Sequence, residues 1–307
     1  MTIQRGNHPC FNAEARHQYG RIHLPVAPKC NIQCNFCNRK YDCVNESRPG
    51  VTSRVLSPGQ ALVYLEQYLK TNPAISTIGI AGPGDPMANP EETLETIRLI
   101  RTAYPGMIFC LSSNGLMLAP YIKDLAGLGV THVTVTLNAV DPAIGAGIYA
   151  WVREGKVIYR GYDGAALLLE RQLLGIAELK RFGMTVKVNT IIIPGINEGH
   201  IGEVARKAAE LGADIMNCMA LVPAPDSHFA QLSAPPQTLV EQVRGQAEVF
   251  LPQMTHCARC RADAAGLIGA APRPEDFELL AQAANLPLHP EESRRYIAVA
   301  TMEGILV

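Results

Sequence analysis

Residues 29–43 read KCNIQCNFCNRKYDC and hold four of the nine cysteines of this chain. Cys30, Cys34 and Cys37 follow a C-x3-C-x2-C spacing, and Cys43 comes six residues later. A structural zinc site takes four ligands, usually from two close pairs, so three cysteines on one short loop supply an incomplete set. A cluster of four irons held by three thiolates instead leaves one iron open to a substrate. The spacing therefore favours an iron–sulfur cluster with an open iron, and a zinc site or a disulfide is the alternative.

The length and composition predict a soluble globular protein. The 307 residues are 48% hydrophobic and carry a formal net charge of −1, which gives no electrostatic reason to expect nucleic acid or an anionic membrane as a partner. No run of about 18 apolar residues is present, and the first twenty residues contain no apolar signal segment. We therefore expect a cytoplasmic protein. In that reducing compartment clustered cysteines indicate metal binding or catalysis more often than disulfides.

Short apolar segments alternate with helix-like segments over residues 20–250, which predicts a parallel sheet with right-handed crossovers. Ser57 and Asn89 each precede a proline and are predicted helix caps. Six strand–helix repeats predict an α/β fold, open or closed into a partial (β/α)6 TIM-type barrel; the eight repeats of a complete barrel are not visible. The predicted strands are 21–26, 77–81, 107–112, 131–137, 185–193 and 214–219, and the predicted helices are 58–70, 90–104, 120–128, 165–182, 200–211, 238–250 and 275–284.

Several predicted strands have one polar face. A parallel strand covered on both sides by apolar layers would be a nearly continuous hydrophobic run, and these strands are not. The polar face predicts a barrel interior that is a cavity for a ligand, and chance alternation on an edge strand is the alternative. The polar sets are His132, Thr134, Thr136 and Asn138; Thr185, Lys187 and Asn189; and Cys110, Ser112 and Asn114 with Ile108.

The pattern changes after residue 250. Cys257 and Cys260 form a C-x2-C pair in HCARC, an Ala/Gly-rich stretch leads to the predicted helix, and residues 285–293 read as a linker. Residues 295–307, RYIAVATMEGILV, are predicted to be one strand and the start of another.

The C-x3-C-x2-C loop, with Phe36 before its last cysteine, resembles the radical S-adenosylmethionine (SAM) family. GIAGPGDP at 79–86, SSNG at 112–115 and VNTIIIPGIN at 188–197 match the family's SAM-binding segments in order. The resemblance implies that the open iron binds the amino and carboxylate groups of SAM and that an electron from the cluster cleaves SAM to a 5′-deoxyadenosyl radical. It also implies a set of SAM contacts: Phe36, Gly82, Pro83, Gly84, Asp85, Ser112, Asn114, Asn138, Asn189 and Ile191.

Within that family the chain closely resembles the NifB branch, which assembles the core of the nitrogenase iron–molybdenum cofactor. The resemblance is nearly continuous over residues 7–270 and includes 7–53, 79–89 (GIAGPGDPMAN), 111–116 (LSSNGL) and 256–266 (HCARCRADAAG). It implies a lyase- or transferase-type enzyme that fuses two [4Fe-4S] clusters into a carbide-centred eight-iron precursor. One SAM would donate a methyl group and a second would supply the radical.

The resemblance also implies how the remaining cysteines act. His23, Cys43 and Cys110 would hold one substrate cluster, and Cys10, Cys257 and Cys260 the other, so that three [4Fe-4S] sites and SAM are expected. Cys218, with no motif around it, is predicted to be a small buried hydrophobe. Arg39, Glu46 and Arg48 either tune cluster charge and shuttle protons or are solvated loop charges. The remaining histidines are predicted not to be ligands: His8, His17, His132, His200, His228, His256 and His289.

The resemblance divides the chain into four parts. Residues 1–19 are an N-terminal cluster-binding extension, 20–250 the partial barrel, and 251–284 a C-terminal cluster-binding extension, with both extensions over the barrel mouth. Residues 285–307 are a linker and the start of a truncated NifX-like domain.

The implied partners are cluster donors, an electron donor such as ferredoxin, and a cofactor carrier or scaffold, with no nucleic acid and no membrane. The alternatives are another radical SAM maturase with auxiliary clusters, and a non-catalytic iron–sulfur scaffold.

Overall fold

The computed structural model describes residues 5–43, 52, 54–258, 260–271 and 273–288. Its main sheet has seven strands in the order β10-β1-β3-β4-β5-β8-β9. Six of them run parallel, and the seventh, β10, pairs antiparallel with β1. The partial barrel predicted from the strand–helix alternation is confirmed. The strands are β1 (Gly20–His23), β3 (Ile75–Ile80), β4 (Ile108–Ser113), β5 (Val130–Thr136), β8 (Thr185–Ile192), β9 (Ile215–Ala220) and β10 (Ala265–Gly266).

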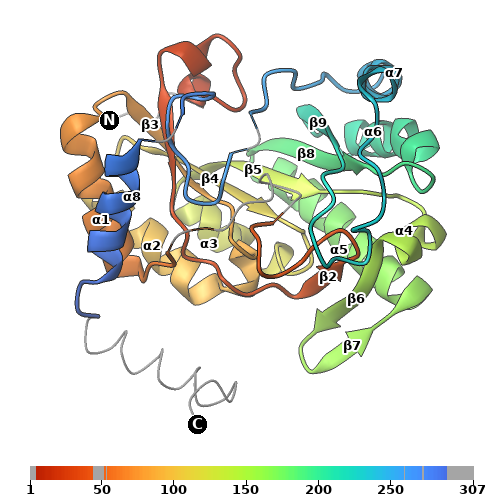
Figure 1. Cartoon of the computed structure of the whole chain (residues 1–307), viewed down its shortest axis with the longest axis horizontal. Helices are drawn as coiled ribbons and strands as arrows, with labels where there is room; N and C mark the ends of the chain where they lie inside the picture. The colour runs from red at the N-terminus through yellow and green to blue at the C-terminus, as the bar shows by residue number, and fades with distance from the viewer. Residues whose placement is uncertain (1–4, 44–51, 53, 259, 272, 289–307) are drawn as a thin grey trace.

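Helices cover the outside of the curled sheet (Figure 1). Apolar side chains from both layers form the hydrophobic core between them. The predicted helices are present, although the predicted helix 120–128 is divided between a 3-10 turn and α3. The helices are α1 (Pro58–Thr71), α2 (Pro90–Ala103), α3 (Ile122–Gly127), α4 (Pro142–Ile148), α5 (Gly161–Arg181), α6 (Ile201–Glu210), α7 (Gln237–Glu248) and α8 (Pro274–Ala284). Short 3-10 turns are η1 (Arg5–Asn7), η2 (Ala15–His17), η3 (Pro86–Ala88), η4 (Ala119–Tyr121) and η5 (Glu198–His200).

Both predicted helix caps occupy the N-cap position before a proline. Ser57 forms a capping box at α1, in which its side chain accepts the Gln60 N–H and the Gln60 side chain accepts the Ser57 N–H. Asn89 makes no side-chain capping bond at α2. Its amide group bonds both main-chain groups of Lys29 instead.

A second sheet was not predicted. It consists of β2 (Ile32–Cys34), β6 (Tyr149–Glu154) and β7 (Val157–Tyr159), in that order. Strand β2 lies inside the cysteine loop, and β6 and β7 form a hairpin that projects from the barrel (Figure 1). Each strand is short and carries no long hydrophobic run, so periodicity could not reveal it.

The two ends of the described chain meet over one end of the sheet, where the red and blue segments lie side by side in Figure 1. His256 contacts the Pro9 carbonyl through Nε2 at 3.1 Å, and the His23 N–H donates to the Ala264 carbonyl at 2.8 Å. Helix α8 packs on α1, where the Gln60 amide donates to the Leu286 carbonyl at 2.9 Å. The NifX-like segment predicted for 295–307 lies outside the described residues.

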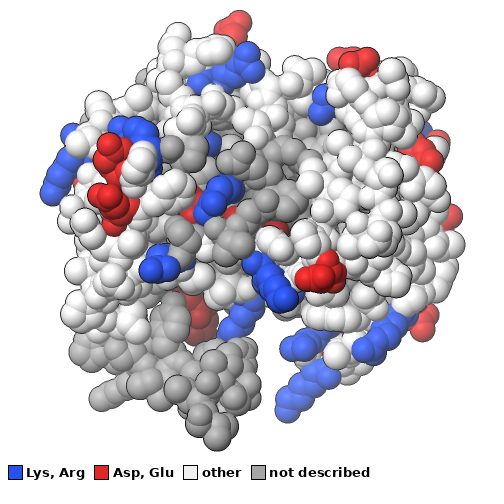
Figure 2. All heavy atoms as spheres, in the orientation of Figure 1, with Lys and Arg blue, Asp and Glu red and all other residues white. Residues whose placement is uncertain are grey.

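In the described part of the chain no helix has the length and apolarity needed to cross a membrane. Lysines and arginines are dispersed among acidic residues on the face drawn in Figure 2.

Candidate iron–sulfur and SAM site

The cysteine loop is held by main-chain bonds before any metal is considered. Strand β2 pairs with β6, and the Cys37 N–H donates to the Cys34 carbonyl at 3.0 Å. The Gln33 side-chain amide donates to the carbonyls of both Cys34 and Cys37, at 3.0 and 2.7 Å. These bonds turn the three thiols of the motif toward one small cavity, which we call the loop cavity. Its described lining is Cys30, Ile32, Cys34, Cys37, Arg39, Cys43, Gly84, Asp85, Ser112, Ser113, Asn114 and Thr136.

The glycine-rich segment after β3 packs directly against the start of this loop. A Cβ atom on Gly84 would lie 2.1 Å from the Lys29 carbonyl oxygen, so no side chain fits there. The Gly84 N–H donates to the Ala27 carbonyl at 2.6 Å, and the Asp85 N–H donates to the Lys29 carbonyl at 2.8 Å. The close approach explains the need for glycine at this position.

Asp85, a predicted SAM contact, uses its carboxylate within the protein. The carboxylate accepts the Ser113 hydroxyl at 3.1 Å, the Asn114 N–H at 2.5 Å and the Met87 N–H at 2.8 Å. Burial raises the pKa of this carboxyl, and these hydrogen bonds oppose the shift. Asp85 therefore fixes the end of β4 beside the cysteine loop.

The other predicted SAM contacts divide into two groups. Ser112 and Asn114 line the loop cavity with Gly84 and Asp85, and Asn189 lines the neighbouring cavity described below. The remaining five are not among the described lining residues of either cavity. Phe36, Asn138 and Ile191 are fully buried, and the Asn138 side-chain oxygen accepts the Ile191 N–H at 2.9 Å. The Gly82 carbonyl accepts the Ala27 N–H, and Pro83 bridges to Ala27.

The loop cavity fits a cluster held by three thiolates. Burial raises the pKa of the Cys30 thiol to about 11, and the negative charge of Asp85 is a second cause. This thiol therefore ionises readily only when a metal ion binds its sulfur. Two buried polar atoms here, Asn31 Nδ2 and Ser112 Oγ, have no partner among the described residues, as expected where a polar ligand binds.

Among the described residues no three His, Cys, Asp or Glu side chains converge on a point that would hold a single ion. A four-iron cubane places each thiolate on a different iron and needs no such convergence.

A second cavity, which we call the strand cavity, lies on the polar face predicted from the sequence. Thr134, Lys187 and Asn189 line it from two neighbouring strands, and Ser112 lines both cavities. Four cysteines reach the strand cavity from the N-terminal segment, β4 and the C-terminal segment. Its described lining is His8, Cys10, Phe11, His23, Gly79, Ile80, Ala81, Cys110, Leu111, Ser112, Thr134, Lys187, Asn189, Asn217, Met254, Cys257, Ala258, Cys260 and Ile268.

His23 has the geometry of a metal-binding histidine. Its Nδ1 lies 3.0 Å from the Arg261 carbonyl, so that nitrogen carries the proton and Nε2 keeps its lone pair. A Cβ atom on Gly79 would lie 2.7 Å from the His23 ring and 3.4 Å from Cys110 Sγ. The absence of a side chain at 79 therefore lets His23 and Cys110 face each other across β3. Burial, with the nearby charge of Arg21, lowers the pKa of His23 to about 4.

The predicted ligand sets are only partly brought together. Cys10, Cys257 and Cys260 line the strand cavity together, although about 250 residues separate the first from the others. His23 and Cys110 line it too, but Cys43 lines the loop cavity with the three motif cysteines. Cys43 directly precedes residues 44–51, which are outside the described part and include Glu46 and Arg48. The grouping of Cys43 with His23 and Cys110 stays a prediction.

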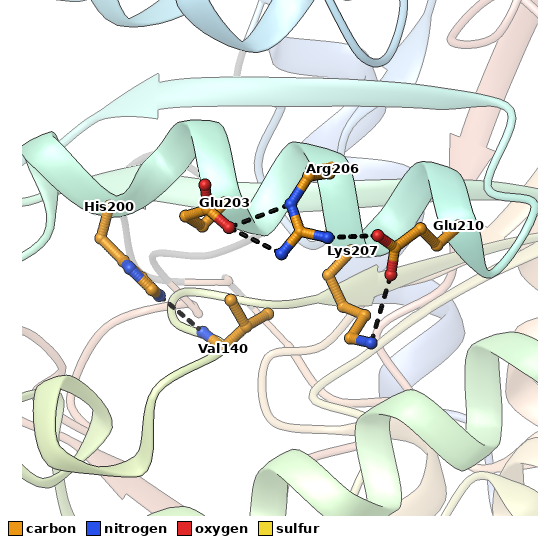
Figure 3. A network of polar contacts seen from close by, with 6 residues as sticks. All are labelled: Val140, His200, Glu203, Arg206, Lys207 and Glu210. Carbon is orange, nitrogen blue, oxygen red and sulfur yellow. Dashed lines mark hydrogen bonds and ion pairs between the residues drawn. The ribbon is translucent and has the colours of Figure 1, made fainter.

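Two of the histidines predicted not to be ligands, His132 and His200, make contacts within the fold. His200 accepts the Val140 N–H through Nε2 at 3.1 Å and so fixes the loop after β5 (Figure 3). On helix α6, which follows, Arg206 pairs with Glu203 and Glu210 at the exposed surface. His132 packs against the His8 ring at a centroid separation of 4.5 Å. Cys218 lies in the hydrophobic core as predicted.

Sequence reasoning missed two residues that line the strand cavity, His8 and Lys187, and a third that contacts one of its cysteines, Arg21. His8 was predicted not to be a ligand, and it is buried and lines the cavity. Lys187 lines it with its ammonium 5.2 Å from the centre of the Phe11 ring. Arg21 donates to Cys260 Sγ at 2.9 Å. The available signal was the placement of Lys187 on the polar face of its strand and the position of Arg21 next to His23.

Comparison with known proteins agrees with this geometry. The family model described as the radical SAM superfamily matches residues 24–208. In *Chlorobaculum tepidum* a relative named FeMo cofactor biosynthesis protein NifB is 57% identical over 307 residues, which is 100% of this chain and 72% of that protein. Its namesake in *Klebsiella pneumoniae* is 44% identical over 284 residues, which is 91% of this chain but only 60% of that protein.

Among solved structures, *Streptococcus suis* SuiB bound to S-adenosylmethionine superimposes with a TM-score of 0.54 at 14% identity, covering 77% of this chain and 50% of that one. At that identity the likeness concerns the fold. The family model and the relatives decide membership: the chain belongs to the radical SAM superfamily and, within it, to the NifB family of FeMo cofactor biosynthesis proteins.

Proposed function

We propose that this chain is the radical SAM enzyme that fuses two [4Fe-4S] substrate clusters into the carbide-centred eight-iron precursor of the nitrogenase cofactor. One SAM serves as methyl donor and a second as radical source. The observation that carries the proposal is the adjacency of two cysteine-lined cavities that share Ser112. One holds the three-thiol motif, and the other gathers four cysteines and His23.

Cys30, Cys34 and Cys37 would hold the resident cluster in the loop cavity. When bound, that cluster supplies the electron that cleaves SAM to a 5′-deoxyadenosyl radical. Asp85 and Asn89 hold the loop in place by bonding to main-chain groups on either side of the cavity. Gly84, Ser112 and Asn114 offer backbone and side-chain atoms at the cavity wall to the SAM molecule.

The strand cavity would hold the substrate clusters. His23 presents an unprotonated Nε2 next to Cys110, and a neutral imidazole is a weaker ligand than a thiolate, which suits a site whose cluster must be rebuilt. Cys10, Cys257 and Cys260 would hold the second cluster. Thr134 and Thr136, two residues apart on β5, line the strand and loop cavities respectively, so a radical formed in one has a short buried path to the other.

The partners we propose follow from this chemistry. The chain needs donors of iron–sulfur clusters, a low-potential electron donor of the ferredoxin type, and a carrier or scaffold that accepts the product.

Replacement of Cys30, Cys34 and Cys37 by alanine tests the proposal. After anaerobic reconstitution the wild-type chain should contain roughly twelve irons and form 5′-deoxyadenosine with SAM and reductant. The triple variant should lose roughly four irons and all 5′-deoxyadenosine, because only the open-iron cluster cleaves SAM. Cys218→Ala, in the hydrophobic core, is the control and should keep all of its iron.

Other outcomes point to the alternatives. SAM cleavage without an eight-iron product would favour a different radical SAM maturase. A chain that binds clusters and never cleaves SAM would be a scaffold.

A further inference from the structure

Buried hydrogen-bond donors without acceptors gather at the strand cavity. His8, Arg21 and Lys187, which we call the donor set, come from the N-terminal segment, β1 and β8, and each is at least nine-tenths buried. His8 Nε2 and Arg21 Nε have no partner among the described residues. A buried donor without an acceptor is destabilising, so two of them close to one cavity indicate a ligand that accepts hydrogen bonds.

The proton on His8 can be placed from its surroundings. The Cys10 N–H donates to His8 Nδ1 at 3.1 Å. A ring nitrogen that accepts carries no proton, so the proton lies on Nε2. Nε2 is therefore a donor, and it belongs to a residue that lines the cavity.

Lys187 and Arg21 bring positive charge to the strand cavity, Lys187 as a lining residue and Arg21 through its bond to Cys260. Lys187 lies beside Phe11, and among the described residues no carboxylate pairs with its ammonium. Arg21 donates to Cys260 Sγ at 2.9 Å and to the carbonyls of Gly266 and Leu267. Lys187 is the cation among the described lining residues of the strand cavity, and no Asp or Glu is among them. Arg21 lies outside that lining, in a hollow that it shares with Asp263 and Asp276, but its bond to Cys260 Sγ brings its positive charge to a cysteine of the strand cavity. A buried ammonium without a carboxylate indicates an anionic ligand.

We propose that His8, Arg21 and Lys187 recognise the substrate cluster bound by Cys10, Cys257 and Cys260, by donating hydrogen bonds to its sulfides and thiolates and by balancing its negative charge. This inference rests on the proposed function. A thiolate-bound four-iron cluster is anionic, and its sulfides accept hydrogen bonds and donate none. The Asn217 side-chain oxygen is an unmatched acceptor in the same cavity, so the donors outnumber it. The donor set is a group of positioning residues that select an anionic, sulfide-rich ligand.

Two substitutions of His8 separate this role from a structural one. His8→Asn keeps an oxygen near Nδ1 that can accept the Cys10 N–H, but its side chain is too short to donate from the Nε2 position. His8→Gln places an amide nitrogen near the Nε2 position and loses the acceptor. Lys187→Met removes the charge and Lys187→Arg restores it. Arg21 is left unchanged because it also holds two main-chain carbonyls. Lys207→Met, on the exposed face of α6, is the control.

The measurements are made on the full chain with Cys43 and Cys110 replaced by alanine, which leaves the resident cluster and the cluster of Cys10, Cys257 and Cys260. One measurement is the rate at which a chelator removes iron. The other is the reduction potential of each cluster, measured by EPR-monitored titration. The resident cluster is identified as the one whose EPR spectrum changes when SAM is added.

His8→Asn and Lys187→Met should speed iron loss from the other cluster about tenfold or more and shift its potential to more negative values. His8→Gln, Lys187→Arg and Lys207→Met should stay close to the starting protein. Iron loss that is fast in His8→Gln and normal in His8→Asn would overturn the donor role and leave His8 as a support for Cys10. Equal rates and potentials in all variants would overturn it as well. A starting protein that binds only the resident cluster would instead contradict the proposed ligand set, and with it this inference.

Discussion

At the scale of single residues, the site depends on one position without a side chain. Gly79 lies between His23 on β1 and Cys110 on β4, with which it is paired in register. A methyl group there would overlap the His23 ring at 2.7 Å. The ring also bonds the Arg261 carbonyl, so it cannot move away without breaking that bond.

We expect Gly79→Ala to lower the free energy of unfolding by about 1–3 kcal/mol through overpacking and to lower the iron bound by His23 and Cys110. Urea denaturation and iron quantitation on the reconstituted chain measure the two effects. Gly147→Ala is the matched control, because a Cβ atom there has its nearest neighbour at 3.9 Å. Normal iron content and stability in Gly79→Ala would contradict the close packing of His23 against residue 79.

At the scale of elements, the cysteine loop is placed by its neighbours as well as by its own sequence. Strand β2 pairs with the β6–β7 hairpin on one side. On the other side Asn89, at the start of α2, accepts the Lys29 N–H at 3.2 Å and donates to the Lys29 carbonyl at 2.9 Å. Asn89 therefore holds Lys29, the residue before Cys30, at both its main-chain N–H and its carbonyl.

Asn89→Ala should cost about 1–3 kcal/mol of stability, because the Lys29 N–H loses the Asn89 oxygen as its acceptor and the Lys29 carbonyl keeps only the Asp85 N–H. We also expect slower 5′-deoxyadenosine formation, since the loop that carries Cys30 is no longer fixed. Asn72→Ala, at the end of α1, also removes an asparagine hydrogen bond to a main-chain carbonyl, that of Tyr68, at a distance from the loop. The prediction fails if the two variants form 5′-deoxyadenosine at the same rate.

At the scale of the whole molecule, the two cysteine-bearing ends of the described chain close over the sheet. His256 contacts the Pro9 carbonyl, and β10 joins the C-terminal segment to β1. Burial raises the pKa of the Cys10 thiol to about 11, and the nearby charges of Lys187 and Arg21 act in the opposite direction. A cluster shared by Cys10, Cys257 and Cys260 would therefore tie both ends of the fold together.

If these three cysteines share one cluster, Cys10→Ala and Cys257→Ala should each cost roughly four irons per chain. The double variant should cost no more, because the two residues act as one unit. SAM cleavage should persist while the eight-iron product is lost. Additive iron losses, or zinc in place of the missing iron, would show that Cys257 and Cys260 form a separate site.

Removal of residues 289–307 should leave all clusters and SAM cleavage intact, because every described lining residue of both cavities precedes residue 269. The Leu286 carbonyl accepts a bond from Gln60, so the cut is placed after it. Iron content, 5′-deoxyadenosine formation and thermal unfolding of the shortened chain check this. Loss of a cluster on deletion would mean that the final segment contributes to the site.

The sequence by itself determined the elements whose signals are local. Long periodic segments such as α1 and α5 and the parallel strands were predicted within a few residues, because hydrophobic periodicity and capping depend on nearby positions. The spacing of Cys30, Cys34 and Cys37 predicted a cluster, and the polar face of β5 and β8 predicted a cavity. Both signals also depend on nearby positions. The place of His8 in the strand cavity and the bonds of Asn89 to Lys29 had no such signal.

Only the tertiary structure decided which of these groups meet. Cys10 and Cys260 come within one cavity because the chain ends close over the sheet, and no local pattern encodes a contact across 250 residues. Asn89 occupies the predicted cap position of α2, but its side chain bonds Lys29, which lies 60 residues away in the sequence. Hydrogen bonds and cavity walls depend on distances in space, and those exist only once the chain has folded.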